Sequence, residues 1–234
     1  MIINEIRKEL RKHVDQKYHD KIKVFFKEGI KLYGIKTPIV KKISLKYFSS
    51  IKMKSKQEIF SLCEKLLKSG YSEERTIAFD WAFRLKNRYE KKDFKIFETW
   101  LKKYIFNWGA CDDLCIHVFG CFIFQFPKFI PRIKIWAVSK NRWLRRASAV
   151  VLIYSIRRKK LLSSIFELAD ILLFDKDDMV QKGYGWMLKE ASNHYPKKVF
   201  DYVMKHKHEM PRTSLRYAIE KLPTAMKKQA MKKG

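Results

Sequence analysis

A helical hydrophobic spacing that recurs about every 36 residues constrains the fold of this chain more than any other feature. The segment SKNRWLRRASAV aligns without gaps with DKDDMVQKGYGW, and EERTIAF aligns with LRRASAV, which lies about 71 residues later. Repeated helix pairs of this length are typical of α-solenoids of HEAT-like type, in which each pair buries its apolar face against the next. The alignment places basic residues at equivalent positions, namely Arg75, Arg146 and Lys182.

Helix-start signals separate the repeated segments. Ser55 and Glu58 have the spacing of a capping box. Asn107, Asn141 and Asp177 each precede an amphipathic run, as N-cap residues do. No segment alternates between apolar and polar residues in the way that a half-buried strand does. The sequence therefore predicts an all-α chain of successive helices joined by short loops.

These features predict one domain over residues 1–226, an α-solenoid of HEAT-like antiparallel helix pairs with a concave basic groove. Residues 227–234 are predicted to form a basic C-terminal tail. The basic residues at equivalent repeat positions would line one face of the groove; alternatively, they are solvated surface charges. Small residues would let neighbouring helices approach closely, and they are Ala147, Ala149, Gly183 and Gly185.

A formal net charge of +28 points to a polyanionic partner, because charges of this size repel one another and weaken a compact state. Nucleic acid is the first candidate and an anionic membrane surface the second. The longest clean apolar run is well short of the ~20 residues that a bilayer span needs. Acidic and basic residues mix from the fourth residue on, unlike a signal peptide. We expect a monomeric cytoplasmic protein, associated with the nucleoid when it is bound to DNA.

Three of the four cysteines lie in one apolar segment with a histidine, at Cys111, Cys115, His117 and Cys121. Zinc sites usually take ligands from two separated pairs rather than from one helix. The thiols follow the apolar face, and free cysteine is among the most buried residue types. We therefore predict reduced, buried cysteines, no metal site and no cofactor.

Two carboxylates, Asp112 and Asp113, follow the predicted cap at Asn107. Acidic residues near a helix N-terminus interact favourably with the helix dipole, and this accounts for one of them. On an α-helix, Asp112 shares a face with apolar residues, whereas Asp113 lies on a polar stripe with Gly109, His117 and Gly120. An acid in a groove built to hold a polyanion repels phosphate, which argues for a chemical task for Asp113.

The chain resembles the AlkD-type DNA alkylation repair family of HEAT-like glycosylases, from about residue 18 to residue 222. The segments that carry the resemblance are LYGIKTP, NWGACDDL, NRWLRRASAV and QKGYGWMLKE. The resemblance implies a catalytic aspartate at Asp113, a DNA-backbone-binding arginine at Arg146 and an aromatic cleft wall at Trp186. It also implies that the lesion stays in the base stack.

The chain departs from the family pattern in its aromatic residues. The family has two tandem tryptophans before the aspartate; here the first is Trp108 and the second place holds Gly109. An early aromatic residue, often tyrosine in the family, is Phe25, and an arginine after the cleft tryptophan is replaced by Lys189. Trp81, Trp100, Trp136 and Trp143 are predicted to pack in the core.

Together these observations predict a glycosylase that releases cationic N3- or N7-alkylated purines from duplex DNA. Asp113 would be catalytic. The predicted substrate-binding and DNA-binding residues are Trp108, Trp186, Arg146, Lys182, Lys189, Arg145, Phe25 and Arg75. The alternative is a non-catalytic scaffold of the same fold that recognises DNA or RNA by shape and charge, and a third option is a solenoid that binds an acidic protein.

Overall fold

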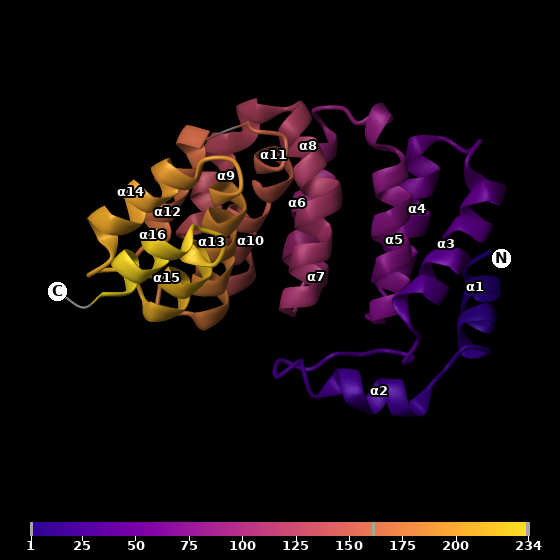
Figure 1. The fold of residues 1–234 in the computed structure, drawn as a ribbon. Coiled ribbons are helices and arrows are strands. Elements are labelled where there is room, and N and C mark those ends of the chain that lie inside the picture. The colour runs from indigo at the N-terminus through magenta and orange to yellow at the C-terminus, as the bar shows by residue number, and fades with distance from the viewer. Residues whose placement is uncertain (1, 161, 233–234) are drawn as a thin grey trace. The chain divides into compact units, whose positions relative to one another are not determined.

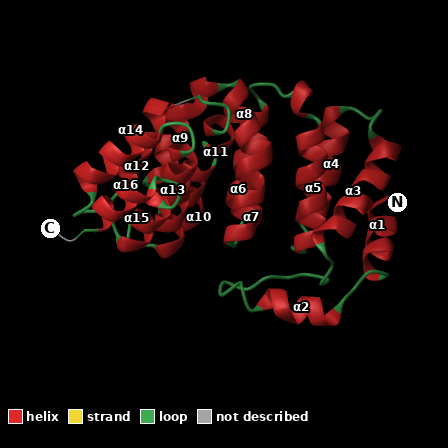
Figure 2. Cartoon of the chain, in the orientation of Figure 1, coloured by secondary structure: helices red, strands yellow, loops and turns green. Residues whose placement is uncertain are grey.

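The computed structural model describes residues 2–160 and 162–232, and the chain forms two compact units, Met1–Leu114 and Cys115–Gly234. Over the described residues the regular elements are helices, joined by turns and short loops (Figure 2). A single isolated bridge joins Lys31 to Tyr71. The all-α, solenoid-like fold class is therefore confirmed, whereas the concave basic groove and the domain limits stay predictions.

In the first unit, α3, α4 and α5 lie side by side, and α7 packs on α5 (Figure 1). The indole Nε1 of Trp81 donates a hydrogen bond to the carbonyl oxygen of Ser44 at 3.0 Å, which ties α5 to α3. The elements are α1 (Ile2–Arg11), α2 (Gln16–Lys23), α3 (Thr37–Ile51), α4 (Lys56–Leu67), α5 (Ser72–Arg84), the 3-10 turn η1 (Lys86–Arg88), α6 (Asp93–Tyr104) and α7 (Trp108–Asp113).

In the second unit, α13 is central and contacts α10, α12 and α15. The elements are the π-helical segment η2 (Leu114–Phe119), which begins at the last residue of the first unit, α8 (Gly120–Gln125), the 3-10 turn η3 (Pro127–Phe129), α9 (Ile130–Ala137), α10 (Arg142–Val150), α11 (Ile153–Ile156), α12 (Leu162–Leu172), α13 (Asp178–Ser192), α14 (Pro196–His206), α15 (Arg212–Ile219) and α16 (Thr224–Met231). Most of the segment expected as a basic tail thus lies in α16, where Ala230 is buried.

The predicted helix starts are confirmed at four positions. Ser55 and Glu58 form the capping box of α4. The side chain of Asn107 caps α7 by accepting a hydrogen bond from the Ala110 N–H. Asn141 and Asp177 cap α10 and α13 in the same way. These caps satisfy backbone donors that have no partner inside the helix, so local chemistry sets where each helix begins.

The core contains the residues that the sequence assigned to it. Trp81, Trp100, Trp136 and Trp143 are buried. All four cysteines are buried as free thiols, and burial raises the pKa of the Cys63 thiol above its usual range. Within the described residues, no single helix is long and apolar enough to span a membrane. The helices Trp108–Gln125 and Pro127–Ala137, bent by 106°, pass that test together by length and composition alone.

Close helix contact at Gly185 confirms the role expected of the small residues. A Cβ atom placed on Gly185 would lie 2.7 Å from the Cβ of Tyr217 and 2.9 Å from the carbonyl oxygen of Ser214, both in α15. The helices α13 and α15 can therefore approach closely only because residue 185 has no side chain. At Gly183 the nearest atom is Cγ of Arg146 at 3.1 Å, so an added Cβ would require a shift of only a few tenths of an ångström.

Gly185→Ala should lower the free energy of unfolding by about 1–3 kcal/mol, because the added methyl group overpacks a rigid contact with backbone atoms. Gly183→Ala is the matched control in the same helix. It should be close to neutral, since the strain on Arg146 is offset by the better helix propensity of alanine, about 1 kcal/mol. Chemical denaturation of both variants measures the difference, and equal effects would contradict the close-contact explanation.

Candidate active site

The candidate site is built on α7, whose first turn is fixed by the buried side chain of Asn107. Gly109 and Asp113 are four residues apart on this helix and therefore share one face. Both Asp112 and Asp113 are half-buried. Asp113 is thus half-buried on a helix face where the residue one turn earlier, Gly109, has no side chain.

The polar stripe expected to continue from Asp113 through His117 to Gly120 ends with α7. The segment Leu114–Phe119 is π-helical, and its wider turn breaks the α-helical register on which that expectation rested. His117 is exposed and Gly120 is buried. The prediction of a common stripe is therefore wrong beyond Asp113.

A buried arginine from α5 interacts electrostatically with Asp113. Arg75 is 9% exposed, and its guanidinium donates a hydrogen bond to Oγ of Ser72 at 3.0 Å. Among the described residues, its Nε has no hydrogen-bond partner. Burial lowers the pKa of Arg75, and the negative charges of Asp113 and Glu73 oppose that shift. Asp113 is therefore part of the charge compensation of a buried cation.

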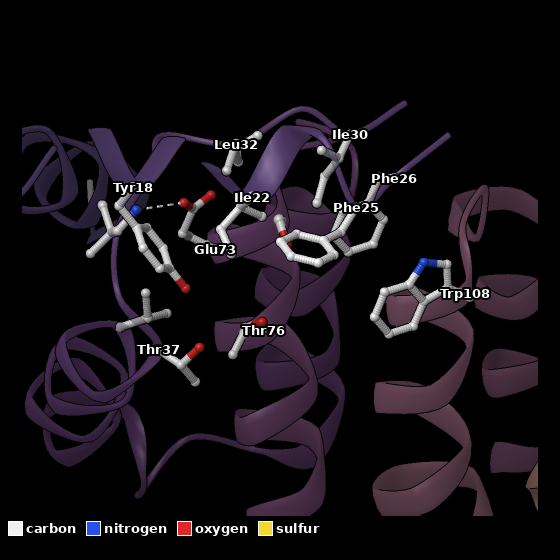
Figure 3. Close-up of a pocket in the computed structure, with 13 residues that line it drawn as sticks. Tyr18, Ile22, Phe25, Phe26, Ile30, Leu32, Thr37, Glu73, Thr76 and Trp108 are labelled. Atoms are coloured by element: carbon white, nitrogen blue, oxygen red, sulfur yellow. Dashed lines mark hydrogen bonds between the residues drawn. The ribbon is translucent and has the colours of Figure 1, made fainter. Parts of the chain in front are cut away.

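Trp108 forms an aromatic pair with a residue from the segment after α2. The rings of Phe26 and Trp108 stack with their centroids 4.8 Å apart and an angle of 4° between their planes. Figure 3 shows the two rings approaching each other from different elements. A Cβ atom on Gly109 would lie 3.1 Å from Cε1 and 3.2 Å from Cζ of Phe26. The Phe26 ring therefore covers the helix face where Gly109 lacks a side chain.

Beside this pair lies a cavity of about 300 Å³ within the first unit (Figure 3). Aromatic and aliphatic side chains form most of its wall, including Tyr18, Phe25 and Trp108, and hydroxyl groups of Thr37 and Thr76 also reach it. Phe25 is 62% exposed and lies in the turn directly after α2. The cavity is thus mainly apolar with a few polar groups, as small-ligand pockets generally are.

One wall of the cavity contains the buried carboxylate of Glu73. It accepts hydrogen bonds from the backbone N–H groups of Tyr33, Gly34 and Ile35 at 2.9–3.1 Å. The neighbouring Glu74 accepts hydrogen bonds from Arg7 and from the hydroxyl of Tyr33. Burial and the bond to Glu74 raise the pKa of Tyr33. These two acids hold the loop before α3 against the start of α5.

The remaining predicted DNA-binding residues lie in the second unit, and most are engaged in contacts there. Arg146 is buried and its guanidinium donates to the carbonyl oxygen of Met179. Trp186 donates from Nε1 to Glu190 at 2.9 Å. Ion pairs join the other three cations to acids: Arg145 to Asp175, Lys182 to Asp178 and Lys189 to Glu220.

Glu190 holds Trp186 in a defined position. Burial raises the pKa of this carboxyl, but hydrogen bonds from Arg157 and Trp186 outweigh burial and lower its pKa below the usual value. Arg157 binds Glu190 through two nitrogens, at 2.9 and 3.0 Å. The indole of Trp186 is therefore fixed by a charged network.

Phe25 and Trp108 line one cavity in the first unit, whereas Asp113 and Arg75, which interact electrostatically with each other, are not among the residues that line it. The alternative interpretation of the repeated basic position was that its residues are solvated surface charges. It is wrong for Arg75 and Arg146, because both are buried. Sequence reasoning missed Phe26 and Glu73. The adjacent phenylalanines at 25 and 26 and the paired acids at 73 and 74 are the only sequence signals of these roles. Over residues 2–160 and 162–232, no group of histidine, cysteine and acidic side chains is arranged to hold a metal ion.

The fold and the site define a class: an all-α, solenoid-like protein of strongly basic charge with an aspartate on the helix that carries one of two stacked aromatic rings. The family model for the DNA alkylation repair enzyme matches residues 6–222, and the chain belongs to that family. It is similar to the solved structure of a predicted DNA alkylation repair enzyme from Enterococcus faecalis, with a TM-score of 0.80 and 16% sequence identity. That match covers 91% of this chain and 98% of the other. A search of curated proteins found no significant match.

Arg75 and Asp113 should be coupled energetically, because neutralising the acid leaves a buried guanidinium less compensated. We expect a double-mutant cycle of Arg75→Met and Asp113→Asn to give an interaction free energy of about 0.5–3 kcal/mol. Urea denaturation of wild type, both single variants and the double variant measures it. Additive effects of the two substitutions would contradict the interaction.

Proposed function

We propose that this chain is a DNA glycosylase that hydrolyses the N-glycosidic bond of cationic N3- or N7-alkylated purines in duplex DNA, with Asp113 as its catalytic residue. The observation that carries the proposal is the position of Asp113 at the end of α7, half-buried and interacting electrostatically with the buried Arg75, on the helix that begins with Trp108. Membership of the DNA alkylation repair family and the net charge of +28 support DNA as the substrate.

The chemistry suits a single carboxylate. Glycosidases usually need a second carboxyl group, because the leaving oxygen must be protonated. An alkylated purine already carries a positive charge, so the electron pair of the breaking C1′–N bond neutralises it and the base leaves without a proton. Water then attacks C1′, and its proton passes to solvent or to the carboxylate.

Asp113 would stabilise the positive charge that develops on the sugar. A carboxylate ~4 Å from that charge contributes ~4 kcal/mol at an effective dielectric constant near 20. This corresponds to roughly a thousandfold increase in rate. Arg75 is buried and therefore would not contact the DNA itself. It would act as a positioning residue that restrains the Asp113 carboxylate.

The basic residues of the second unit would hold the DNA backbone. Ion pairs such as Lys182–Asp178 are partly exposed, and pairs of this kind contribute only about 0.2–1 kcal/mol. Lys182 and Lys189 can therefore exchange their acidic partner for a DNA phosphate at little cost in free energy. Arg145 and Arg146 are more enclosed, and Trp186 would contribute an aromatic surface. Contact through the backbone leaves the lesion in the base stack, as the family resemblance implies.

Wild-type protein should release 7-methylguanine from duplex DNA faster than the spontaneous reaction, and Asp113→Asn should reduce the rate by a factor of roughly a thousand. Asp112→Asn is the matched control on the same helix turn and should keep most of the activity. Base release is measured under single-turnover conditions, with thermal unfolding as a check that both variants fold.

Wild type no faster than spontaneous loss, or Asp113→Asn equal to wild type, would contradict the glycosylase. Binding to duplex DNA without base release would instead favour the non-catalytic scaffold. Salt dependence cannot separate the two, because both predict an affinity that falls steeply with salt, with a slope of about −0.9 per phosphate neutralised.

A further inference from the structure

Four large apolar residues are exposed at the ends of two helices of the second unit. The helices are α9 and α12, which contact each other (Figure 1). The residues and their exposed fractions are Ile135 57%, Val138 72%, Ile171 41% and Phe174 68%. Single apolar residues at a protein surface need no explanation, but a contiguous group with a polar rim is typical of a docking site.

The exposed residues recur with the period of the solenoid. The segments IWAVSK (135–140) and ILLFDK (171–176) lie one repeat period of about 36 residues apart. Each segment has exposed apolar residues at its first and fourth positions and an exposed lysine, Lys140 or Lys176, at its sixth. The segments differ at the other three positions, so what the two repeats share is the exposed surface.

Arg145 of α10 holds the two segments side by side. Its guanidinium donates to the carbonyl oxygens of Ser139 and Lys140 at 2.9 and 3.1 Å, in the connection after α9. It also donates to the carboxylate of Asp175 at 2.6 Å, in the connection after α12. The exposed apolar residues beside these anchors therefore form one group whose geometry is fixed before a partner arrives. We call this group, together with Lys140 and Lys176, the α9–α12 surface.

The α9–α12 surface lies outside the helices that carry the predicted DNA-binding residues of the second unit. Those residues are on α10 and α13. The helix α9 packs on α10, and α12 packs on α13, so each repeat has one helix for each role. DNA and a partner protein would therefore contact different helices.

We propose that the α9–α12 surface docks a short acidic segment of a partner protein. The apolar side chains of that segment pack on the two exposed rows, and its carboxylates pair with Lys140 and Lys176. This arrangement sets a rule for the partner, which needs apolar anchors at regular spacing and acids beside them. The inference goes beyond the proposed function and does not depend on it.

Charge and size favour this occupant over a second copy of the chain. A second copy also carries a net charge of +28, so two copies repel each other. A stable interface between folded proteins usually buries about 20–30 residues on each side, far more than the α9–α12 surface offers. A short segment of opposite charge fits both its charge and its extent.

The distribution of charge also favours a peptide over an anionic membrane. Lysines stand at one end of the α9–α12 surface. One turn before Ile171, at the other end, the side chain of Glu167 is 48% exposed and forms an ion pair with Lys134. A uniformly anionic membrane would meet both ends, whereas a peptide can place its carboxylates at the lysine end alone.

The probe is a labelled acidic peptide of about 12 residues with leucines at helical positions i, i+4 and i+7. Its control has serine in place of each leucine and carries the same charge, so the ratio of the two Kd values reports apolar contact. Val138→Ser combined with Phe174→Ser should lower this ratio about tenfold, or ~1.4 kcal/mol. Val24→Ser combined with Phe106→Ser is the matched control, because those residues are 81% and 67% exposed in the first unit.

A second pair of variants tests the lysines. Lys140→Gln combined with Lys176→Gln should weaken binding of the leucine peptide about twofold to thirtyfold, the range for two exposed ion pairs. Lys52→Gln combined with Lys91→Gln removes the same charge from exposed positions of the first unit and should have a smaller effect. Equal effects would mean that only the overall charge attracts the peptide, which contradicts a defined lysine edge.

Equal binding of the leucine and serine peptides by wild type would overturn the inference. So would a variant Val138→Ser, Phe174→Ser that keeps the peptide ratio but loses binding to phosphatidylglycerol vesicles, or one that dissociates a wild-type dimer in sedimentation. The same variant should bind duplex DNA as wild type does, and a loss of DNA affinity would instead assign the surface to DNA. Base release, the readout of the proposed function, enters none of these measurements, so either proposal can fail alone.

Discussion

The hydrogen bonds from three consecutive backbone N–H groups to Glu73 are the interaction on which the candidate site depends. The loop that they anchor follows α2 and carries Phe25 and Phe26 toward α7. A buried carboxylate is costly unless its oxygens are hydrogen-bonded, and three donors compensate it here. The adjacent Glu74 binds Arg7 and Tyr33, so the start of α5 organises both the N-terminal helix and this loop. Two acids in a very basic chain thus serve to place aromatic residues.

Acidic side chains elsewhere in the chain also make specific contacts. With 24 acidic against 52 basic residues, most buried or half-buried acids have a cation as partner. Lys56 is held by Asp93, Arg142 by Asp177 and Arg157 by Glu190. The cations that remain outnumber the acids available to them. An anionic partner therefore relieves a repulsion that the fold cannot neutralise by itself.

Local features were predictable from the sequence, and contacts between distant segments were not. The caps at Ser55, Asn107, Asn141 and Asp177 depend on residues within one helical turn, so their sequence signals were sufficient. Core packing was the default expectation for the four tryptophans to which no motif gave another role, and all four are buried. Phe26 was missed because its contact with Trp108 joins an irregular turn to a helix far along the chain. The burial of Arg75 was also missed, because a charged residue on a repeated helix looks the same in sequence whether it faces solvent or a neighbouring helix.

The π-helical segment after Asp113 requires a glycine at position 120. A Cβ atom on Gly120 would run into the carbonyl oxygen of Cys115, five residues earlier, and into Tyr154 and Val151. The wide turn accommodates one residue more than an α-helical turn of the same rise, and only glycine fits where it closes. Glycine at position 120 therefore serves two contacts at once: it closes the wide turn over the Cys115 carbonyl, and it lets the segment of Val151 and Tyr154 approach the same helix.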